Sequence, residues 1–386
     1  MKSISQVVIN TPASGIRRFF DIVSQMDDVV SLGVGEPDFV TPWHFIEKGI
    51  ESLEKGKTSY TSNYGLLELR QAISRFLQKN DGLEYNPENQ ILITVGVSEG
   101  MDLVMRAILN PGDEVVVAEP NYVSYLPCIQ FAGGVPARIE TTAENEFRIT
   151  ADQFEKAITP KTKAILLSYP CNPTGATADR QLLEKIVAIA VKHDLYIISD
   201  EIYDRLTYDG EHVCVPTIKG AYERTIYLNG FSKAYAMTGW RVAYACGAPE
   251  IIEAMMKIHQ YTIMCAPSVG QYAALEAITN GLKDSDKMIA EYAKRRKVIV
   301  KGLNDAGLQC LTPGGAFYAF PSIKNTGMSS DDFCEKLLFE EKVAAVPGSA
   351  FGKCGEGHIR CCYATSLNKI NIAMERIARF VKNNCG

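Results

Sequence analysis

The side chains of this sequence that could do chemistry lie directly after short apolar runs. Asp200 follows one run, Asn172 follows a second, and Lys233 lies close behind a third, with Arg241 eight residues further on. A fourth run leads into residues 96–98, where backbone N–H groups at the start of a helical pattern can bind an anion. The set therefore combines an anion site, an amide, a carboxylate, an amine and a guanidinium.

Alternating strands and helices must position these residues. Near-continuous apolar runs, typical of strands buried on both faces, occupy residues 91–95, 115–118, 164–167, 195–199, 225–228 and 242–245. Amphipathic helical patterns lie at 66–77 and 181–191. The alternation predicts an α/β fold with a mostly parallel sheet, in which ligands bind at the carboxyl ends of the strands. The chemically useful residues are therefore expected to share one edge of that sheet.

The chain changes character after residue 280. A long charged helix is expected over 284–303 and a final amphipathic helix over 370–381, with Gly- and Pro-punctuated sequence between them. These patterns predict a large domain over residues 46–280. A smaller α+β domain is expected from both chain ends, residues 1–45 and 281–386.

Composition bounds the class of protein. With 386 residues, 46% hydrophobic and 22% charged, the chain has enough apolar sequence for two or three well-filled units. A net charge of −5 gives no overall positive field, so nucleic acid is not expected as a partner. The basic run at 294–297 is interpreted as a solvated helix face, because residues 288, 292 and 299 give the same helix an apolar face.

Cysteine usage and hydropathy bear on location. The 11 cysteines show neither C-x-x-C spacing nor paired Cys and His spacing, and no stretch approaches the ~20 apolar residues that span a bilayer. No metal site and no membrane contact are therefore expected. A reducing cytoplasm is the predicted compartment.

Three ligand classes can be compared with the residue set. A dinucleotide site is poorly supported, because Asp38 stands where the third glycine of G-x-G-x-x-G belongs. A nucleotide phosphate loop at 348–353 is one residue short, and Cys354 stands where Ser or Thr is required. Pyridoxal 5′-phosphate fits better, since it has a phosphate, a basic ring nitrogen and an aldehyde that reacts with lysine.

Motifs along nearly the whole chain point to a family. They include LGVGEPDF at 32–39, YTSNYGLLELR at 60–70, NPGDEV at 110–115, YPCNPTGA at 169–176, SDEIY at 199–203, NGFSKAYAMTGWR at 229–241 and GGAFYAFP at 314–321. The chain resembles class I pyridoxal phosphate-dependent aminotransferases of fold type I, particularly the bacterial and archaeal aspartate and aromatic enzymes. That resemblance implies a large domain with a mostly parallel seven-stranded sheet between helices.

The resemblance assigns roles at the reactive end of the cofactor. Lys233 would form the Schiff base with the aldehyde, and Asp200 would hold the pyridine nitrogen. Asn172 and Tyr203 would contact the ring hydroxyl, with Tyr203 also counted among the catalytic residues. Tyr122 occupies the position where many relatives stack a tryptophan on the ring.

The resemblance also assigns the phosphate and substrate contacts. The phosphate site would consist of Gly96, Val97, Ser98, Ser232 and Arg241, with Tyr60 reaching it from the neighbouring subunit of a homodimer. Gly230 departs from some relatives, which have a phosphate-binding serine there. Arg360, helped by Asn172 and the backbone near Gly35, would bind the substrate α-carboxylate.

The expected reaction is ping-pong amino transfer between an L-amino acid, aspartate or aromatic, and a 2-oxo acid such as 2-oxoglutarate. Alanine and acyl-diaminopimelate are alternative amino donors. A lyase reaction on the same scaffold is a further alternative, because the cofactor ring can stabilise loss of other α-substituents.

Overall fold

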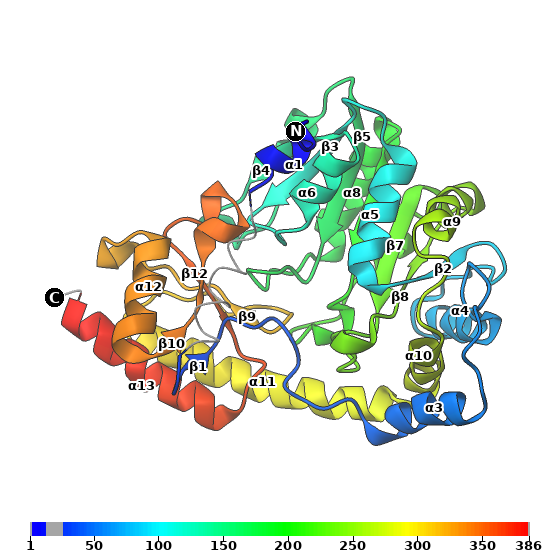
Figure 1. Cartoon of the computed structure of the whole chain (residues 1–386). Helices are drawn as coiled ribbons and strands as arrows, with labels where there is room; N and C mark the ends of the chain where they lie inside the picture. Colours follow the sequence, from blue (N-terminus) through cyan, green and yellow to red (C-terminus); the bar gives the residue numbers. More distant parts are fainter. Residues whose placement is uncertain (1, 13–25, 385–386) are drawn as a thin grey trace.

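A seven-stranded sheet forms the centre of the larger part of the molecule in a computed structural model, which describes residues 2–12 and 26–384 (Figure 1). The strands lie in the order β2 (Ile91–Thr94), β8 (Ala243–Cys246), β7 (Thr225–Gly230), β6 (Tyr196–Asp200), β5 (Thr162–Ser168), β3 (Glu114–Glu119) and β4 (Val135–Glu140). Pairing is parallel from β7 through β4, and β8 is antiparallel to both its neighbours. The predicted fold class is confirmed.

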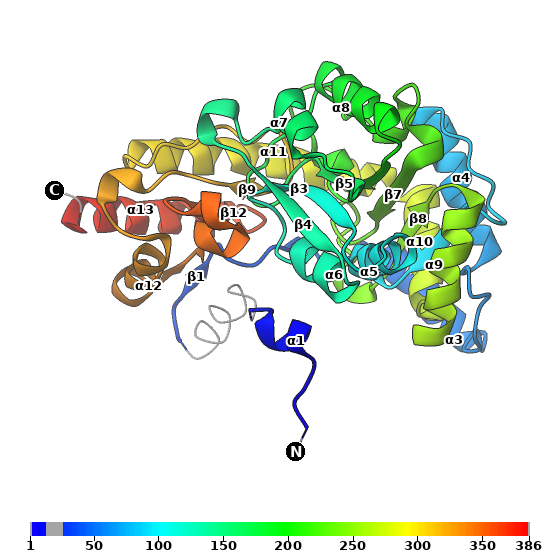
Figure 2. The same ribbon diagram turned by 90° about the horizontal axis from the view of Figure 1, so that it is seen from above.

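Helices cover both faces of this sheet (Figure 2). On one side lie α5 (Gly96–Ile108), α6 (Tyr125–Phe131) and α9 (Pro249–Thr262), and on the other lie α7 (Ala151–Ala157) and α8 (Arg180–Lys192). Val115 and Val117 pack among the first group of helices, whereas Val116 packs among the second. Because successive strand side chains point to opposite faces, both faces need apolar residues, which explains the near-continuous runs in the sequence.

Further helices complete the larger part of the molecule. Packed together at one end of the sheet are α3 (Trp43–Glu54), α4 (Leu67–Asp81) and α10 (Ser268–Asn280). The short helix α1 (Gln6–Asn10) lies near α6. Short 3-10 turns occur at Ala143–Asn145, Asp204–Leu206, Val215–Thr217, Tyr222–Arg224 and Thr238–Trp240.

The C-terminal region forms the second part of the molecule. Helix α11 (Leu282–Asp305) runs along both parts and packs against α13 (Leu367–Asn384), which also contacts α12 (Ser330–Glu341). A three-stranded antiparallel sheet contains β11 (Val346–Pro347), β12 (Ile359–Cys362) and β9 (Tyr318–Ala319). Additional 3-10 turns lie at Lys324–Thr326, Gly348–Phe351 and Lys353–Gly355.

The two ends of the chain meet in this second part. Strand β1 (Val30–Ser31) pairs in parallel with β10 (Val343–Ala344). This pairing is consistent with a small domain built from both chain ends. The boundaries at residues 46 and 281 stay a prediction, and α3 spans the first of them.

The interpretation of the basic run at 294–297 was partly wrong. Arg295 and Arg296 are buried in α11, where Arg295 lies 2.7 Å from Asp38 and Arg296 pairs with Asp209 at 2.5 Å. The two lysines of the run, Lys294 and Lys297, are exposed. The arginines therefore anchor α11 to neighbouring segments through partly buried ion pairs. No helix of the described residues is long and apolar enough to cross a bilayer.

Candidate active site

The carboxyl ends of the parallel strands border a cavity of about 390 Å³. It collects residues from many segments that are distant in the sequence. Of the residues assigned to the site from the sequence, the cavity is lined by Gly35, Val97, Ser98, Tyr122, Asn172, Asp200, Tyr203, Ser232, Lys233, Arg241 and Arg360. The expected edge of the sheet is therefore the edge at which these side chains converge.

Asp200 is the last residue of β6 and is buried. Its Oδ2 accepts a hydrogen bond of 2.8 Å from the Tyr125 hydroxyl, and its Oδ1 accepts one of 3.2 Å from the Ile202 N–H. Burial raises the pKa of Asp200 to about 6, against the lowering effect of these two donors. A cationic group at this carboxylate would favour its charged form.

Lys233 lies in the turn that follows β7. Its Nζ donates a 2.7 Å hydrogen bond to the Gly35 carbonyl and lies 5.8 Å from the centre of the Tyr203 ring. Burial lowers the pKa of Lys233 to about 8, and the positive charges of Arg360 and Arg241 act in the same direction. The amine is therefore much closer to its neutral, nucleophilic form at physiological pH than an exposed lysine would be.

The start of α5 and Arg241 form a positively polarised corner of the cavity. The first turn of α5 begins at Gly96 without a side-chain cap, so its N–H groups are available to an anion. A Cβ atom on Gly96 would overlap the Arg241 guanidinium, which donates to the Thr238 carbonyl at 2.9 Å. Gly96 does not line the cavity itself; its lack of a side chain makes room for Arg241.

Arg360 lies on β12 at the opposite wall and is only 2% exposed. Its guanidinium donates to Asn172 Oδ1 at 2.9 Å and to the Gly33 carbonyl at 2.7 Å, and it lies 4.5 Å from the centre of the Tyr318 ring. Its Nε has no hydrogen-bond partner among the described residues. A buried guanidinium without a carboxylate partner is well suited to a carboxylate ligand.

Two tyrosines at the site were missed by the sequence analysis as functional residues. The Tyr318 hydroxyl lies 2.7 Å from the Tyr203 hydroxyl, and Tyr125 contacts Asp200. Tyr125 lies in a helix rather than directly after a strand, so its position gave no signal. Tyr318 lies within the GGAFYAFP motif, but its place at the site follows from its contacts with Tyr203 and Arg360 in the structure.

Comparison with known proteins identifies the family. A family model described as aminotransferase class I and II matches residues 27–377. The chain belongs to this aminotransferase family. It is 45% identical to an aspartate aminotransferase of Pyrococcus abyssi and 43% identical to an aromatic-amino-acid aminotransferase of Thermococcus litoralis, each over 96% of both chains. A crystal structure of an aromatic aminotransferase from Pyrococcus horikoshii has a TM-score of 0.91 at 44% identity, covering 95% of this chain and 99% of the other.

The aminotransferase family and its fold type I architecture were both predicted correctly. Membership implies pyridoxal 5′-phosphate as cofactor. The residues present fit that group: the Arg241 guanidinium and the uncapped first turn of α5 at the cavity suit a phosphate, and the buried carboxylate of Asp200 suits a ring cation. The lowered pKa of Lys233 suits an amine that reacts with an aldehyde.

Proposed function

We propose that this aminotransferase binds pyridoxal 5′-phosphate in the cavity and transfers the amino group of an L-amino acid to a 2-oxo acid, with 2-oxoglutarate as the expected acceptor. The observation that carries the proposal is the convergence of Lys233, Asp200 and Arg360 on one cavity. When bound, the cofactor supplies an aldehyde for amino groups and a ring that accepts electrons from the substrate α-carbon.

The chain's own residues divide the remaining work. Arg241 and the start of α5 would hold the phosphate, and Asp200 would hold the ring nitrogen in its protonated form. Arg360 binds the substrate α-carboxylate and thereby fixes the α-carbon near Lys233. Once the amino group of the substrate has taken its place on the cofactor aldehyde, the freed Lys233 amine would remove the α-proton, for which its pKa of about 8 is well matched.

Borohydride reduction tests the cofactor assignment. Protein incubated with pyridoxal phosphate and then reduced should carry the cofactor on the peptide that contains Lys233. Lys233→Ala should lose both the label and amino transfer, whereas Lys192→Ala, which removes an exposed lysine on α8, should keep both. Full amino transfer by Lys233→Ala without added amine would refute the assignment.

We infer that an aromatic amino acid is a better donor than aspartate. Among residues 2–12 and 26–384, the cationic side chains that line the cavity are Lys233, Arg241 and Arg360, and each has a role toward the cofactor or the α-carboxylate. Besides Tyr122, which is assigned to the cofactor ring, the cavity wall carries the ring of Tyr318 next to Arg360. Within one protomer, this wall should bind an uncharged aromatic ring more favourably than a second carboxylate.

A panel of amino donors tests this preference. With 2-oxoglutarate as acceptor, kcat/KM for phenylalanine and tyrosine should exceed that for aspartate, alanine and acyl-diaminopimelate. A higher kcat/KM for aspartate would overturn the aromatic preference. The proposed amino transfer itself would remain, because it depends on other residues.

A homodimer is also proposed. Tyr60 does not line the cavity of its own protomer, and its side chain is 80% exposed. Other large apolar side chains of the segments near it are exposed as well, including Val40, Trp43 and Tyr261. A second copy of the chain covering this surface would bury them and bring the partner's Tyr60 to the phosphate.

A cytoplasmic location is the remaining proposal. It is supported by the ten described cysteines, which are free thiols. Burial raises the pKa of several of them, including Cys334 and Cys361, so that they remain protonated. Cell fractionation of a tagged protein tests this location. The proposal would be contradicted if more of the tagged protein than of a cytoplasmic marker were found outside the cytoplasm.

A further inference from the structure

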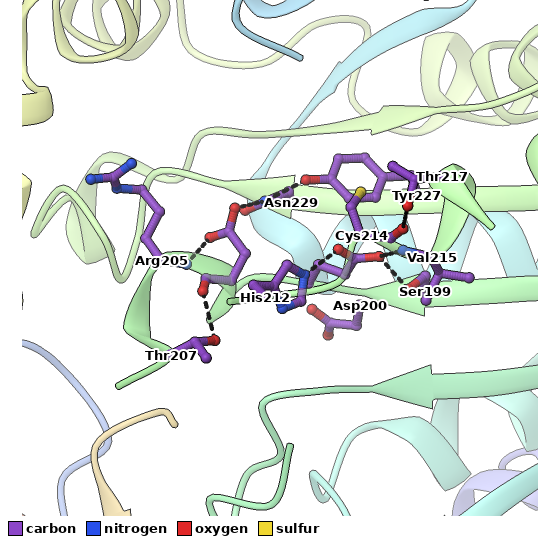
Figure 3. A network of polar contacts seen from close by, with 12 residues as sticks. Ser199, Asp200, Arg205, Thr207, His212, Cys214, Val215, Thr217, Tyr227 and Asn229 are labelled. Carbon is purple, nitrogen blue, oxygen red and sulfur yellow. Dashed lines mark hydrogen bonds and ion pairs between the residues drawn. The ribbon is translucent and has the colours of Figure 1, made fainter. Parts of the chain in front are cut away.

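A buried polar network that includes Ser199, His212 and Val215 lies next to Asp200 (Figure 3). Successive side chains at the end of β6 alternate in direction. Asp200 lines the cofactor cavity, whereas Ser199 and Glu201 line a second cavity of about 310 Å³. The sequence motif SDEIY thus places side chains in two cavities, and the role of its glutamate is not explained by cofactor binding.

Glu201 connects the end of β6 to the segment 212–215. Its Oε1 accepts hydrogen bonds from the Ser199 hydroxyl at 2.7 Å and from the Val215 N–H at 3.0 Å. Its Oε2 lies 2.5 Å from His212 Nε2. With an exposed fraction of 1%, the carboxylate is fully enclosed, so these contacts fix the backbone on the C-terminal side of Asp200.

The backbone of Glu201 is held equally firmly. Its N–H donates to the Leu228 carbonyl on β7 at 2.9 Å, and its carbonyl accepts from the Asp204 N–H at 2.9 Å. Asp204 is in turn held by the Asn229 amide at 2.9 Å. The backbone and side-chain contacts of Glu201 therefore act together on the end of β6, which carries Asp200.

His212 lies among carboxylates that favour its positively charged form. Burial acts to lower the pKa of His212, but the charges of Glu201, Asp204 and Asp81 together raise it above its ordinary value. The negative charge of Glu201 also contributes to the raised pKa of Asp200, after the effect of burial. An unneutralised Glu201 would therefore favour the protonated form of Asp200.

We propose that Glu201 and His212 form a positioning pair for Asp200: the pair holds the end of β6 and neutralises the Glu201 charge, so that Asp200 meets the cofactor ring nitrogen correctly oriented and ionised. The inference rests on the proposed binding of pyridoxal phosphate. It goes beyond that proposal, because neither residue lines the cofactor cavity.

The experiment compares two cofactors on the same apoprotein. One is pyridoxal 5′-phosphate, and the other is its 1-deaza analogue, in which carbon replaces the ring nitrogen. Phosphate binding and aldehyde chemistry are common to both, so the ratio of their dissociation constants reports the contact of Asp200 with the nitrogen. General loosening of the site would weaken both and leave the ratio unchanged.

His212→Gln removes the positive charge and keeps a polar side chain. We expect the preference for pyridoxal phosphate over the analogue to fall by about tenfold, the effect of one pKa unit at Asp200. The matched control is His193→Asn, which removes a histidine paired with Glu155 at 2.9 Å on the surface and should keep the wild-type preference. The double variant Glu201→Gln/His212→Gln removes both charges and should recover part of the preference.

Folded His212→Gln protein with the wild-type preference would overturn the inference. If that variant does not fold, Ser199→Ala decides, since it keeps both charges and removes one hydrogen bond to Glu201. A fall of about threefold supports the inference and an unchanged preference overturns it. Absence of any preference in the wild-type protein would instead show that the proposed role of Asp200 is wrong.

Discussion

Lys233 is held in surroundings that disfavour its charged form. Burial and two neighbouring guanidinium groups lower its pKa to about 8, while the Gly35 carbonyl accepts its hydrogen bond. Because an unfolded lysine has a pKa near 10.4, the charged amine destabilises the folded apoprotein. The same feature that makes the amine reactive therefore has a cost in stability.

Replacement of this amine should stabilise the apoprotein in a pH-dependent way. Between about pH 8 and pH 10.4 the unfolded chain binds more protons at position 233, so wild-type stability gains there as pH rises. At pH 7 the free energy of unfolding of Lys233→Met should exceed that of wild type by about 2 kcal/mol, and this difference should be smaller at pH 10. Urea denaturation at both pH values checks this; a constant or growing difference would contradict the lowered pKa.

The Tyr125 hydroxyl is expected to tune Asp200. Tyr125→Phe removes the 2.8 Å donor to Oδ2 and should raise the pKa of the carboxylate, which weakens its interaction with a ring cation. Affinity for pyridoxal phosphate should fall about tenfold, as expected for one hydrogen bond to a charged group. Fluorescence titration of the apoprotein gives the measurement.

A matched control exists for this change. Tyr235 is also buried, and its hydroxyl has no hydrogen-bond partner among the described residues. Tyr235→Phe should therefore leave cofactor affinity as in wild type. Equal losses in both variants would indicate a packing effect rather than a contact with Asp200.

Among the elements, the strands with continuous apolar sequence were predictable, whereas the half-exposed strand and the very short strands were not. All six predicted runs form strands of the sheet, because strands buried on both faces need continuous apolar sequence. β4, with the sequence VPARIE, lies at the sheet edge and is half exposed, so its pattern is diluted. The two-residue strands β1, β9, β10 and β11 are too short to carry any periodicity.

The site residues that directly follow predicted strands were also predictable, for a related reason. Asp200, Asn172 and Lys233 follow predicted strands, so the topology of a parallel sheet brings them together. The ion pairs of Arg295 and Arg296 could not be foreseen, because their partners Asp38 and Asp209 are distant in sequence. Glu201 is adjacent to a predicted residue, but strand alternation sends it to the other face.

The pairing of β7 with β8 explains the glycine at position 230. Gly230 lies opposite Ala243, and a Cβ atom there would stand 2.6 Å from the Ala243 Cβ. Gly230→Ala should therefore reduce the free energy of unfolding by about 2 kcal/mol through overpacking. The Cβ atom of a serine at position 230 would also stand too close to Ala243. Ser232, two residues further on, is the serine that lines the cavity.

Urea denaturation also checks this prediction. The control is Gly247→Ala, just beyond the other end of β8, where a Cβ atom would make ordinary contacts of 3.4 Å or more. That variant should stay within about 0.5 kcal/mol of wild type. An equally mild effect at position 230 would mean that the strands can separate to admit a methyl group.

At the scale of the whole molecule, the proposed dimer predicts complementation between subunits. Lys233→Ala and Tyr60→Ala proteins should each have low activity, because each lacks one component of every site. After mixing, unfolding and refolding together, hybrid dimers should contain one site with both native residues. About a quarter of wild-type activity should then return if subunits pair at random.

The unmixed variants, refolded separately and then assayed together, are the control. They should show no recovery, since no hybrid forms. Recovery in that control, or full activity of a monomer in light scattering, would remove the need for the partner's Tyr60. A complete absence of recovery in the refolded mixture would indicate that Tyr60 acts within its own subunit.

The second cavity, bordered by Ser199, Glu201 and His212, is a site outside the cofactor cavity at which the enzyme could be inhibited. A molecule bound in this cavity that displaced His212 would weaken the binding of pyridoxal phosphate without contacting the amino acid or the oxo acid. Inhibition of that kind would be noncompetitive toward both substrates, and added pyridoxal phosphate would relieve it.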